Sequence, residues 1–345
     1  MHILSQSRET YSIQIQIMEH RDIKSPFTGG PVKEMFELET HSFRGEEYLV
    51  HGWYYLCEDT GRKFSTGEQD NATLNDLYSQ YRVKHNIPFP DEIASIRKRY
   101  GLNQSQIGKL LGFGVNQWAK YENGQVPSES NGRLIGALRR KSVTLSLIED
   151  LKDLFEEDEY KKIFHAIQAS PEQDIVPDQD SILYRGTSRS IENGFGEFHH
   201  QKVEEMVKYF AAKGIGVTKL NKKMFYADFL HFKHYGISIS GLRYQAIHYG
   251  PVPVHYATVY DNIPGLERHV QVEGEVERIT YESSTEPNLS VFSPHEISSL
   301  EAIEQLLGNL STREIVELSH KETAWQEHYG QMDIIPYSEA YQLNI

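Results

Sequence analysis

The sequence predicts an α+β fold that is mostly α-helical, with a small N-terminal antiparallel β domain, a helical middle domain and a mainly helical C-terminal domain with a few strands. Two observations support this class. Residues 35–57 carry short runs of aromatic and aliphatic side chains between two turn-forming segments, which is typical of strands. After residue 70, apolar residues recur mostly at intervals of three and four, which is typical of amphipathic helices.

Composition narrows the class of protein. A chain of 345 residues with 39% hydrophobic content can form two or three globular domains. No apolar run approaches the roughly 20 residues that span a bilayer, and the first 20 residues lack the pattern of an export signal. The single cysteine, Cys57, excludes an internal disulfide framework. We therefore expect a cytoplasmic protein that makes no membrane contact.

The N-terminal region has the layout of a zinc ribbon without its ligands. A strand is predicted at 11–17, and turns are predicted at 25–30 and 57–61. Between these turns, two or three strands are predicted at 35–40, 47–50 and 53–57. The four positions where a ribbon holds zinc are occupied by Ser25, Thr28, Cys57 and Thr60. His41 or His51 could join Cys57, but neither has paired spacing. We therefore expect no structural zinc and a sheet held by its aromatic residues, Phe27, Phe36, Phe43, Tyr48, Trp53, Tyr54 and Tyr55.

Residues 102–124 predict two short helices joined by a tight turn. Asn103 can cap the first helix, and Gly112 and Gly114 supply the turn. Gly124 ends the second helix, and Pro127 prevents its continuation. The first helix has apolar Ile107, Leu110 and Leu111, whereas the second is expected to turn Val115, Trp118 and Tyr121 inward and Asn116, Gln117 and Lys120 outward.

This pattern of helix caps and turn residues is typical of a helix-turn-helix, in which the second helix enters the major groove of DNA. An ordinary helical hairpin is the alternative. The turn glycines, the outward polar side chains and the terminal Glu-Asn-Gly occur together, and this combination favours DNA binding. The residues expected to face DNA are Gln104, Ser105, Asn116, Gln117 and Lys120.

The charge distribution agrees with this interpretation. The net charge is −14, but residues 91–141 contain nine Lys or Arg and four Asp or Glu, a local charge of +5. Residues 149–180 have a local charge of −8, with eleven acids and three lysines. A local basic region is sufficient for phosphate contact, and the acidic remainder fits a protein partner or a solvated surface.

Other segments complete the predicted organisation. Helices are expected at 71–99 with a break at 86–90 and an N-cap at Asp91, and at 128–138 and 144–169. The last could pack on its own domain or form a dimer contact. Beyond a linker at 171–194, the second half is expected to have helices at 203–211 and 221–233, amphipathic structure at 242–248, a rigid turn at 249–253, a strand at 273–281 and a helix capped by Ser293. The predicted divisions are 1–70, 71–145, 146–194 and 195–345.

Residues 22–142 resemble the MqsA-type antitoxins, which join a zinc domain to an Xre-like helix-turn-helix. The resemblance rests on Phe43-Arg44-Gly45, on the paired turns and on the segment from Ile96 to Gly124. It implies that Asn116 and Lys120 touch bases. The family usually has arginine in place of Lys120, and lysine lacks the bidentate fork, so a different operator preference is expected.

Residues 196–340 resemble the Panacea domain of SocA-like antitoxins. The segments that carry the resemblance are 220–236, 244–256 and 319–329, with Met224 and Glu322 among the motif positions. The resemblance implies a mostly helical domain that binds and neutralises a cognate toxin. The residues it implies for toxin binding are Tyr226, His248, Tyr249, Gly250, Pro251, Val252, His320 and Trp325.

Motifs for catalysis are weak in this sequence. His320 and Glu322 have poor spacing for metal on a helix, so Trp325 is expected to anchor a core among hydrogen-bonded neighbours, His328 included. His231 and His234 lie one turn apart without a third ligand. The sequence has no nucleophile elbow, Walker loop or dinucleotide fingerprint. We therefore expect no enzyme activity, no cofactor and no metal.

Together these features predict a type II antitoxin that binds a protein toxin encoded by an adjacent gene and represses its own operon. The expected DNA target is a palindromic operator read by a homodimer. Two alternatives remain open at this point: a helix-turn-helix repressor whose C-terminal domain senses a partner, and a proteolytic adaptor that delivers a client to a protease.

Overall fold

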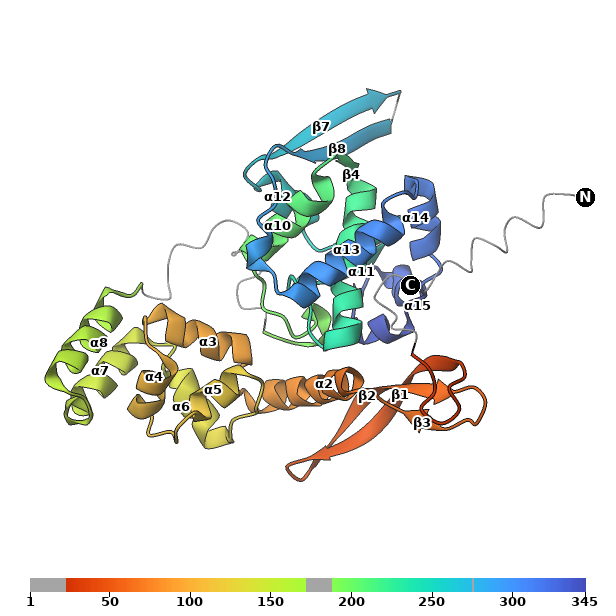
Figure 1. Ribbon diagram of the computed structural model, residues 1–345. Coiled ribbons are helices and arrows are strands. Elements are labelled where there is room, and N and C mark those ends of the chain that lie inside the picture. Colours follow the sequence, from red (N-terminus) through yellow and green to blue (C-terminus); the bar gives the residue numbers. More distant parts are fainter. Residues whose placement is uncertain (1–22, 172–187, 275) are drawn as a thin grey trace, which may run out of the picture. The chain divides into compact units, whose positions relative to one another are not determined.

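A computed structural model describes residues 23–171, 188–274 and 276–345. The strand predicted at 11–17 and most of the linker predicted at 171–194 lie outside these residues. The predicted α+β, mostly α class is confirmed (Figure 1). The chain divides into two compact units, which are described separately below. Of the described residues, unit 1 contains 23–77, 188–274 and 276–345, and unit 2 contains 78–171.

The N-terminal sheet of unit 1 is a long hairpin with a short third strand. The antiparallel order is β1 (Val32–Phe43), β2 (Glu46–Cys57) and β3 (Lys63–Phe64). Arg44 and Gly45 both have positive φ, as tight hairpin turns require. The segments 47–50 and 53–57, which the sequence left as one strand or two, form a single strand, because Gly52 stays in the ladder opposite Glu37. A Cβ at Gly52 would lie 2.7 Å from the Glu39 carboxyl carbon, so the glycine makes room for that side chain.

This sheet packs against the C-terminal part of the same unit. The ring centroids of His51 and Tyr341 are 4.0 Å apart, and those of Phe36 and Tyr341 are 5.6 Å apart. Trp53 lies 5.1 Å from His234. The packing therefore joins residues from the two ends of the chain into one compact unit.

Helix α11 (Val217–Tyr235) is the centre of the C-terminal part (Figure 1). Nearly all of it is buried, and it contacts α10 (His200–Ala211), α13 (Pro294–Leu307) and α14 (Thr312–Ser319). Its buried Asp228 accepts hydrogen bonds from Tyr244, at 2.7 Å, and from the backbone N–H groups of Ile239 and Ser240, both at 2.9 Å. These bonds compensate the removal of a carboxylate from water.

Short strands and helices surround α11. One sheet has the order β4 (Ile215–Gly216), β8 (Val276–Ser283) and β7 (Leu266–Glu273), and the other has the order β6 (Gly250–Pro253), β5 (Tyr244–Ile247) and β9 (Ile334–Ile335). The rigid turn predicted at 249–253 is wrong in extent, because β6 pairs with β5 and leaves only His248 and Tyr249 at the turn. The helices α12 (Tyr256–Asp261) and α15 (Thr323–Gln326) complete this part, and Ser293 caps α13 as predicted.

Unit 2 is helical, and α2 (Gly67–His85) leads into it. Its helices are α3 (Pro90–Arg99), α4 (Gln104–Leu110), α5 (Gln117–Glu122), α6 (Glu129–Ala137), α7 (Lys141–Asp150) and α8 (Glu157–Ala169). Asn103 caps α4 as predicted, and its side chain accepts from the Gln106 N–H. The cap predicted at Asp91 is wrong: Phe89 occupies that position, because Pro90 provides the first helical residue.

The helix predicted at 144–169 is two helices, because the chain reverses between Leu151 and Glu156. This reversal brings Ile148 of α7 and Ile163 and Ile167 of α8 into one core with Trp118. The apolar stripe therefore packs inside unit 2, which is the first of the two alternatives left open by the sequence. Leu154 lies at the reversal and is exposed.

Glu122, at the end of α5, joins three elements of unit 2. Its carboxylate accepts two hydrogen bonds from Arg97 of α3, at 2.6 and 3.1 Å, one from Trp118 at 2.7 Å and one from Gln104 of α4 at 2.5 Å. Burial alone would raise the pKa of Glu122, but these hydrogen bonds outweigh it and lower the pKa. The glutamate thus fixes α5 against α3 and α4.

We expect Glu122→Ala to destabilise unit 2 by roughly 3 kcal/mol, because it leaves the Arg97 guanidinium mostly buried without its carboxylate. Urea denaturation of unit 2 measures the change. The matched control is Glu157→Ala, which removes an exposed ion pair with Lys161 in α8 and should leave the midpoint unchanged. Equal midpoints for the wild type and Glu122→Ala would contradict the structural role of Glu122.

Candidate functional site

The first candidate surface lies in unit 2, where α4 meets the start of α5. A hollow of about 300 Å³ is lined there by three residues expected to face DNA: Gln104, Ser105 and Asn116. Lys109 and Val115 also line it. Ser105, Asn116 and Lys120 are exposed, as a contact surface requires. The structure therefore brings residues of both helices to one concave edge.

Val115 corrects an expectation from the sequence. It was expected to point inward with Trp118 and Tyr121, but its side chain is 93% exposed, whereas the two aromatic residues are buried. The reason is that α5 begins only at Gln117, after Asn116 in the left-handed conformation with φ of 63°. The helical spacing counted from Trp118 therefore does not extend back to Val115.

Two of the polar residues on this surface also make internal hydrogen bonds. The amide nitrogen of Gln104 donates to Glu122, and that of Gln117 donates to the side-chain oxygen of Gln125 at 3.3 Å. Lys109 was not among the residues expected to face DNA. Its position one helical turn after Ser105 was the signal that could have identified it, because residues four apart share a face of a helix.

The four ribbon positions of the N-terminal sheet do come together. The Thr28 hydroxyl lies 3.7 Å from the Cys57 sulfur, and Ser25 and Thr60 also hydrogen-bond to the thiol. Burial would raise the pKa of Cys57, but the hydrogen bonds from these three hydroxyls outweigh it and lower the pKa to about 7. One thiol and three hydroxyls do not fit a structural zinc, which takes thiolate, imidazole or carboxylate ligands.

The second candidate surface lies in the C-terminal part of unit 1. Tyr226 is fully buried and donates a hydrogen bond of 3.1 Å to Glu322, which is also buried. Glu322 further accepts from the backbone and side-chain nitrogens of Asn344, both at 2.9 Å. Burial raises the pKa of Glu322, against the effect of these bonds. Tyr226 therefore lies behind the surface, where it cannot contact a partner directly.

Gly250, Pro251 and Val252 are also buried. The ammonium of Lys222, on α11, donates to the Pro251 carbonyl at 2.8 Å. Gly250 has φ of 93°, and a Cβ there would lie 2.4 Å from the Ser319 hydroxyl and 2.6 Å from Lys222 Cε. A glycine is therefore required at this close approach, and these residues hold the β5–β6 hairpin in place.

The exposed part of this site is aromatic. Trp325 is half-buried and stacks between His320, with centroids 4.0 Å apart, and Tyr329, at 4.5 Å. Its indole N–H donates to the Ile247 carbonyl at 2.8 Å. Tyr329 in turn lies 2.8 Å from the His248 ring nitrogen. We call His248, Tyr249, His320, Trp325 and Tyr329 the aromatic surface.

The structure shows how exposed the residues expected at this surface are. Tyr249 is 61% exposed and His248 is exposed at the hairpin turn, beside the stacked rings. Trp325, expected as a core anchor, is only half-buried in α15 and is bonded to Ile247 of the β5–β6 hairpin. Tyr329 was not expected. Its position four residues after Trp325 was the available signal, because a continued helical turn places both rings on one face.

Comparisons with known proteins identify two regions. Residues 29–149 match the family described as the antitoxin component of bacterial toxin-antitoxin systems, MqsA. Residues 220–326 match the family described as Antitoxin SocA-like, Panacea domain. The chain is 26% identical to Antitoxin MqsA of Escherichia coli (strain K12) over 114 residues, which cover 31% of this chain and 85% of that protein. No solved structure gives a significant match.

Two separate regions of the chain thus match antitoxin families. The resemblance stated from the sequence is therefore confirmed for both regions, and the matches support an antitoxin role in a toxin–antitoxin system. The exposed edge of α4 and α5 lies in the MqsA region, and most of the aromatic surface lies in the Panacea region. Among the described residues, no helix has the length and apolar character needed to cross a bilayer.

We expect Lys222 to make the stability of unit 1 depend on pH. Burial lowers its pKa to about 7, whereas an unfolded lysine keeps its ordinary value near 10.4. Between pH 7 and 9.5 the unfolded chain holds a proton that the folded chain has lost, so the free energy of unfolding should rise with pH. Below pH 7 both states are protonated, and this dependence should disappear.

Denaturation at pH 7, 8 and 9 tests this expectation. In Lys222→Met, the free energy of unfolding should rise less steeply with pH than in the wild type, by roughly 1 kcal/mol per pH unit. Cys57 titrates in the same window, so the informative quantity is the difference between variant and wild type. The exposed Lys213→Met is the matched control and should keep the wild-type slope. Identical slopes for Lys222→Met and wild type would refute the assignment.

Proposed function

We propose that this antitoxin binds its cognate toxin through the aromatic surface of unit 1 and represses its own operon through the helix-turn-helix of unit 2. The observation that carries the proposal is the joining of an exposed α4–α5 edge with an exposed aromatic surface in one chain with two antitoxin regions. In this proposal the protein acts in the cytoplasm, and the toxin is encoded by an adjacent gene.

The proposed DNA contacts follow from where the exposed residues lie. Asn116 stands at the N-terminal end of α5, the end of a recognition helix that approaches base edges. An asparagine amide can bind adenine through two hydrogen bonds, and the neighbouring Val115 offers an apolar contact for a thymine methyl group. Lys109 and Lys120 are exposed beside them and can contact phosphates or guanine.

We further propose that a homodimer places two α5 helices on a palindromic operator. Two-fold helix-turn-helix proteins read half-sites whose centres are about 34 Å apart. The local charge of +5 at residues 91–141 should make operator binding weaken as salt increases, because each phosphate contact releases counterions.

Asn116→Ala should reduce discrimination between operator and random DNA by roughly 1–3 kcal/mol, the worth of one bidentate contact to a base. Binding isotherms on both DNAs at one salt concentration measure the change. Asn123→Ala, at the other end of α5, is the matched control and should keep the wild-type ratio. An unchanged ratio for Asn116→Ala would remove Asn116 from the set of base-reading residues.

The proposed toxin contact uses exposed aromatic side chains that are already held in place. Lys222 and Gly250 fix the hairpin that presents His248 and Tyr249, and Trp325 is stacked on both sides. Rigid aromatic side chains lose little conformational entropy on binding and are common at the centres of interfaces. Tyr226 and β6 support this surface from behind.

We expect Tyr249→Ser in the full chain to weaken toxin binding at least about tenfold, because truncating an aromatic anchor at an interface costs more than 1 kcal/mol. Titration calorimetry with the protein of the adjacent gene measures the affinity, and growth rescue on co-expression gives a second readout. The matched control is Val272→Ser, which removes an equally exposed apolar side chain from β7. An equal loss of toxin affinity in Tyr249→Ser and Val272→Ser would argue against a specific aromatic contact.

A further inference from the structure

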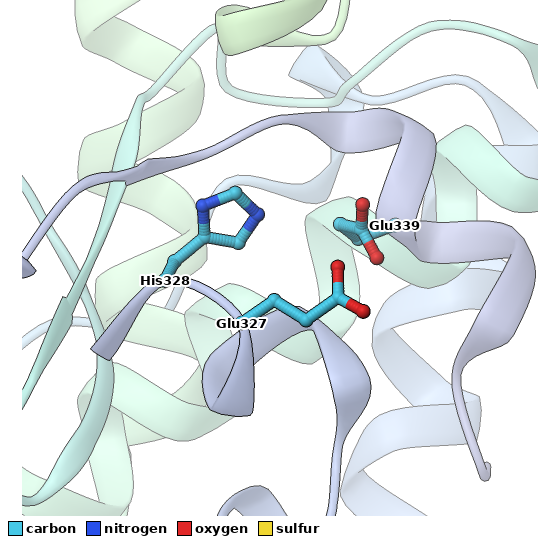
Figure 2. Close-up of side chains that lie close together, drawn as sticks. All are labelled: Glu327, His328 and Glu339. Carbon is cyan, nitrogen blue, oxygen red and sulfur yellow. The ribbon is translucent and has the colours of Figure 1, made fainter. Parts of the chain in front are cut away.

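Three potential metal ligands lie together next to the aromatic surface. Glu327, His328 and Glu339 each offer one ligand atom, and these atoms lie within 4.8 Å of one another. Figure 2 shows the two carboxylates and the imidazole converging from two separate segments. Glu327 and His328 follow α15, and Glu339 lies in the 3₁₀ turn Tyr337–Gln342. None of the three belongs to the residues proposed above for DNA or toxin binding.

A second observation indicates that this cluster lacks a component. Among the described residues, the Nε2 atom of His328 and the Oε2 atom of Glu339 are buried without a hydrogen-bond partner. Such an atom destabilises the fold, because it has lost its hydrogen bonds to water without gaining another partner. The cluster also places two carboxylates side by side; burial, followed by the charge of Glu327, raises the pKa of Glu339. A bound cation would satisfy both buried atoms and remove the repulsion.

We propose that Glu327, His328 and Glu339 bind one divalent transition-metal ion. An imidazole with two carboxylates suits ions such as Zn²⁺ or Mn²⁺, whereas Mg²⁺ and Ca²⁺ prefer sites made of oxygen alone. Ligands of one zinc ion lie roughly 3.5 Å apart, given bonds of about 2.0–2.2 Å. Glu327 is exposed, so its side chain can rotate to close the remaining distance. Three protein ligands leave a further position for water.

The location of the site predicts what a bound ion would hold together. Glu327 and His328 lie in sequence between Trp325 and Tyr329, whose rings stack on each other. Glu339 lies in the turn that carries Tyr341, which contacts His51 and Phe36 of the N-terminal sheet. The ion would therefore tie the corner of the aromatic surface to the turn that packs on the sheet.

Titration calorimetry of the full chain with ZnCl₂ tests the proposal, with MgCl₂ as the hard-cation comparison. We expect one equivalent of Zn²⁺ to bind, with a change in tryptophan fluorescence, and Mg²⁺ to bind far more weakly. His328→Ala and Glu339→Gln should each lower the Zn²⁺ affinity at least about tenfold. Glu327→Gln should lower it as well, and since Glu327 is exposed this variant keeps the test informative if the other two fold poorly.

The matched control is His269→Ala on β7, where an exposed histidine lies 3.9 Å from Glu267 and belongs to no group of three ligands among the residues that the structure describes. This variant should bind Zn²⁺ as the wild type does. The proposal is overturned if Zn²⁺ does not bind, if Mg²⁺ binds equally well, or if Glu327→Gln and His328→Ala retain the wild-type affinity. The test does not depend on toxin or DNA binding, so its result is separate from that of the proposed function.

Discussion

The burial of helix α11 is the constraint on which the C-terminal part of this protein depends. A helix that is buried on nearly every face needs hydrogen-bond partners for its polar side chains. Asp228 has them in the backbone and hydroxyl donors of 239–244, and Lys222 has one in a carbonyl of β6. These bonds bring the β5–β6 hairpin against α11, so the position of the exposed turn follows from the polar groups of a buried helix.

The two proposed contact surfaces are therefore organised in a similar way, although they lie in different units. In each, a buried polar residue holds secondary-structure elements whose exposed ends face outward. Glu122 fixes α5 against α3 and α4, and Lys222 fixes the hairpin that presents Tyr249. In each case the residues that would touch a partner are neighbours of the supporting residues. This arrangement gives a preorganised surface, which lowers the entropy lost on binding.

Local signals in the sequence predicted much of the fold. The Asn103 and Ser293 caps, the positive φ of Gly112 and Gly124 and the strand-like character of the N-terminal region all depend on residues close in the chain. The resemblance to two antitoxin families also came from contiguous motifs. Predictions stayed open or were wrong where a more distant interaction decided the outcome. Gly52 stays within one long strand because it pairs opposite Glu37, and the 144–169 segment reverses because Ile163 and Ile167 share a core with Ile148.

The sequence by itself determined the α+β class, the helix-turn-helix and the two family resemblances, because capping, turn formation and helical periodicity act over a few residues. Tertiary structure decided which motif residues reach the surface. Tyr226 and Gly250 are buried, whereas Val115 is exposed, since burial depends on packing partners far away in the chain. It also brought Glu339 beside Glu327 and His328. Helical and strand spacing could not predict this cluster, because Glu339 comes from a separate segment of the chain.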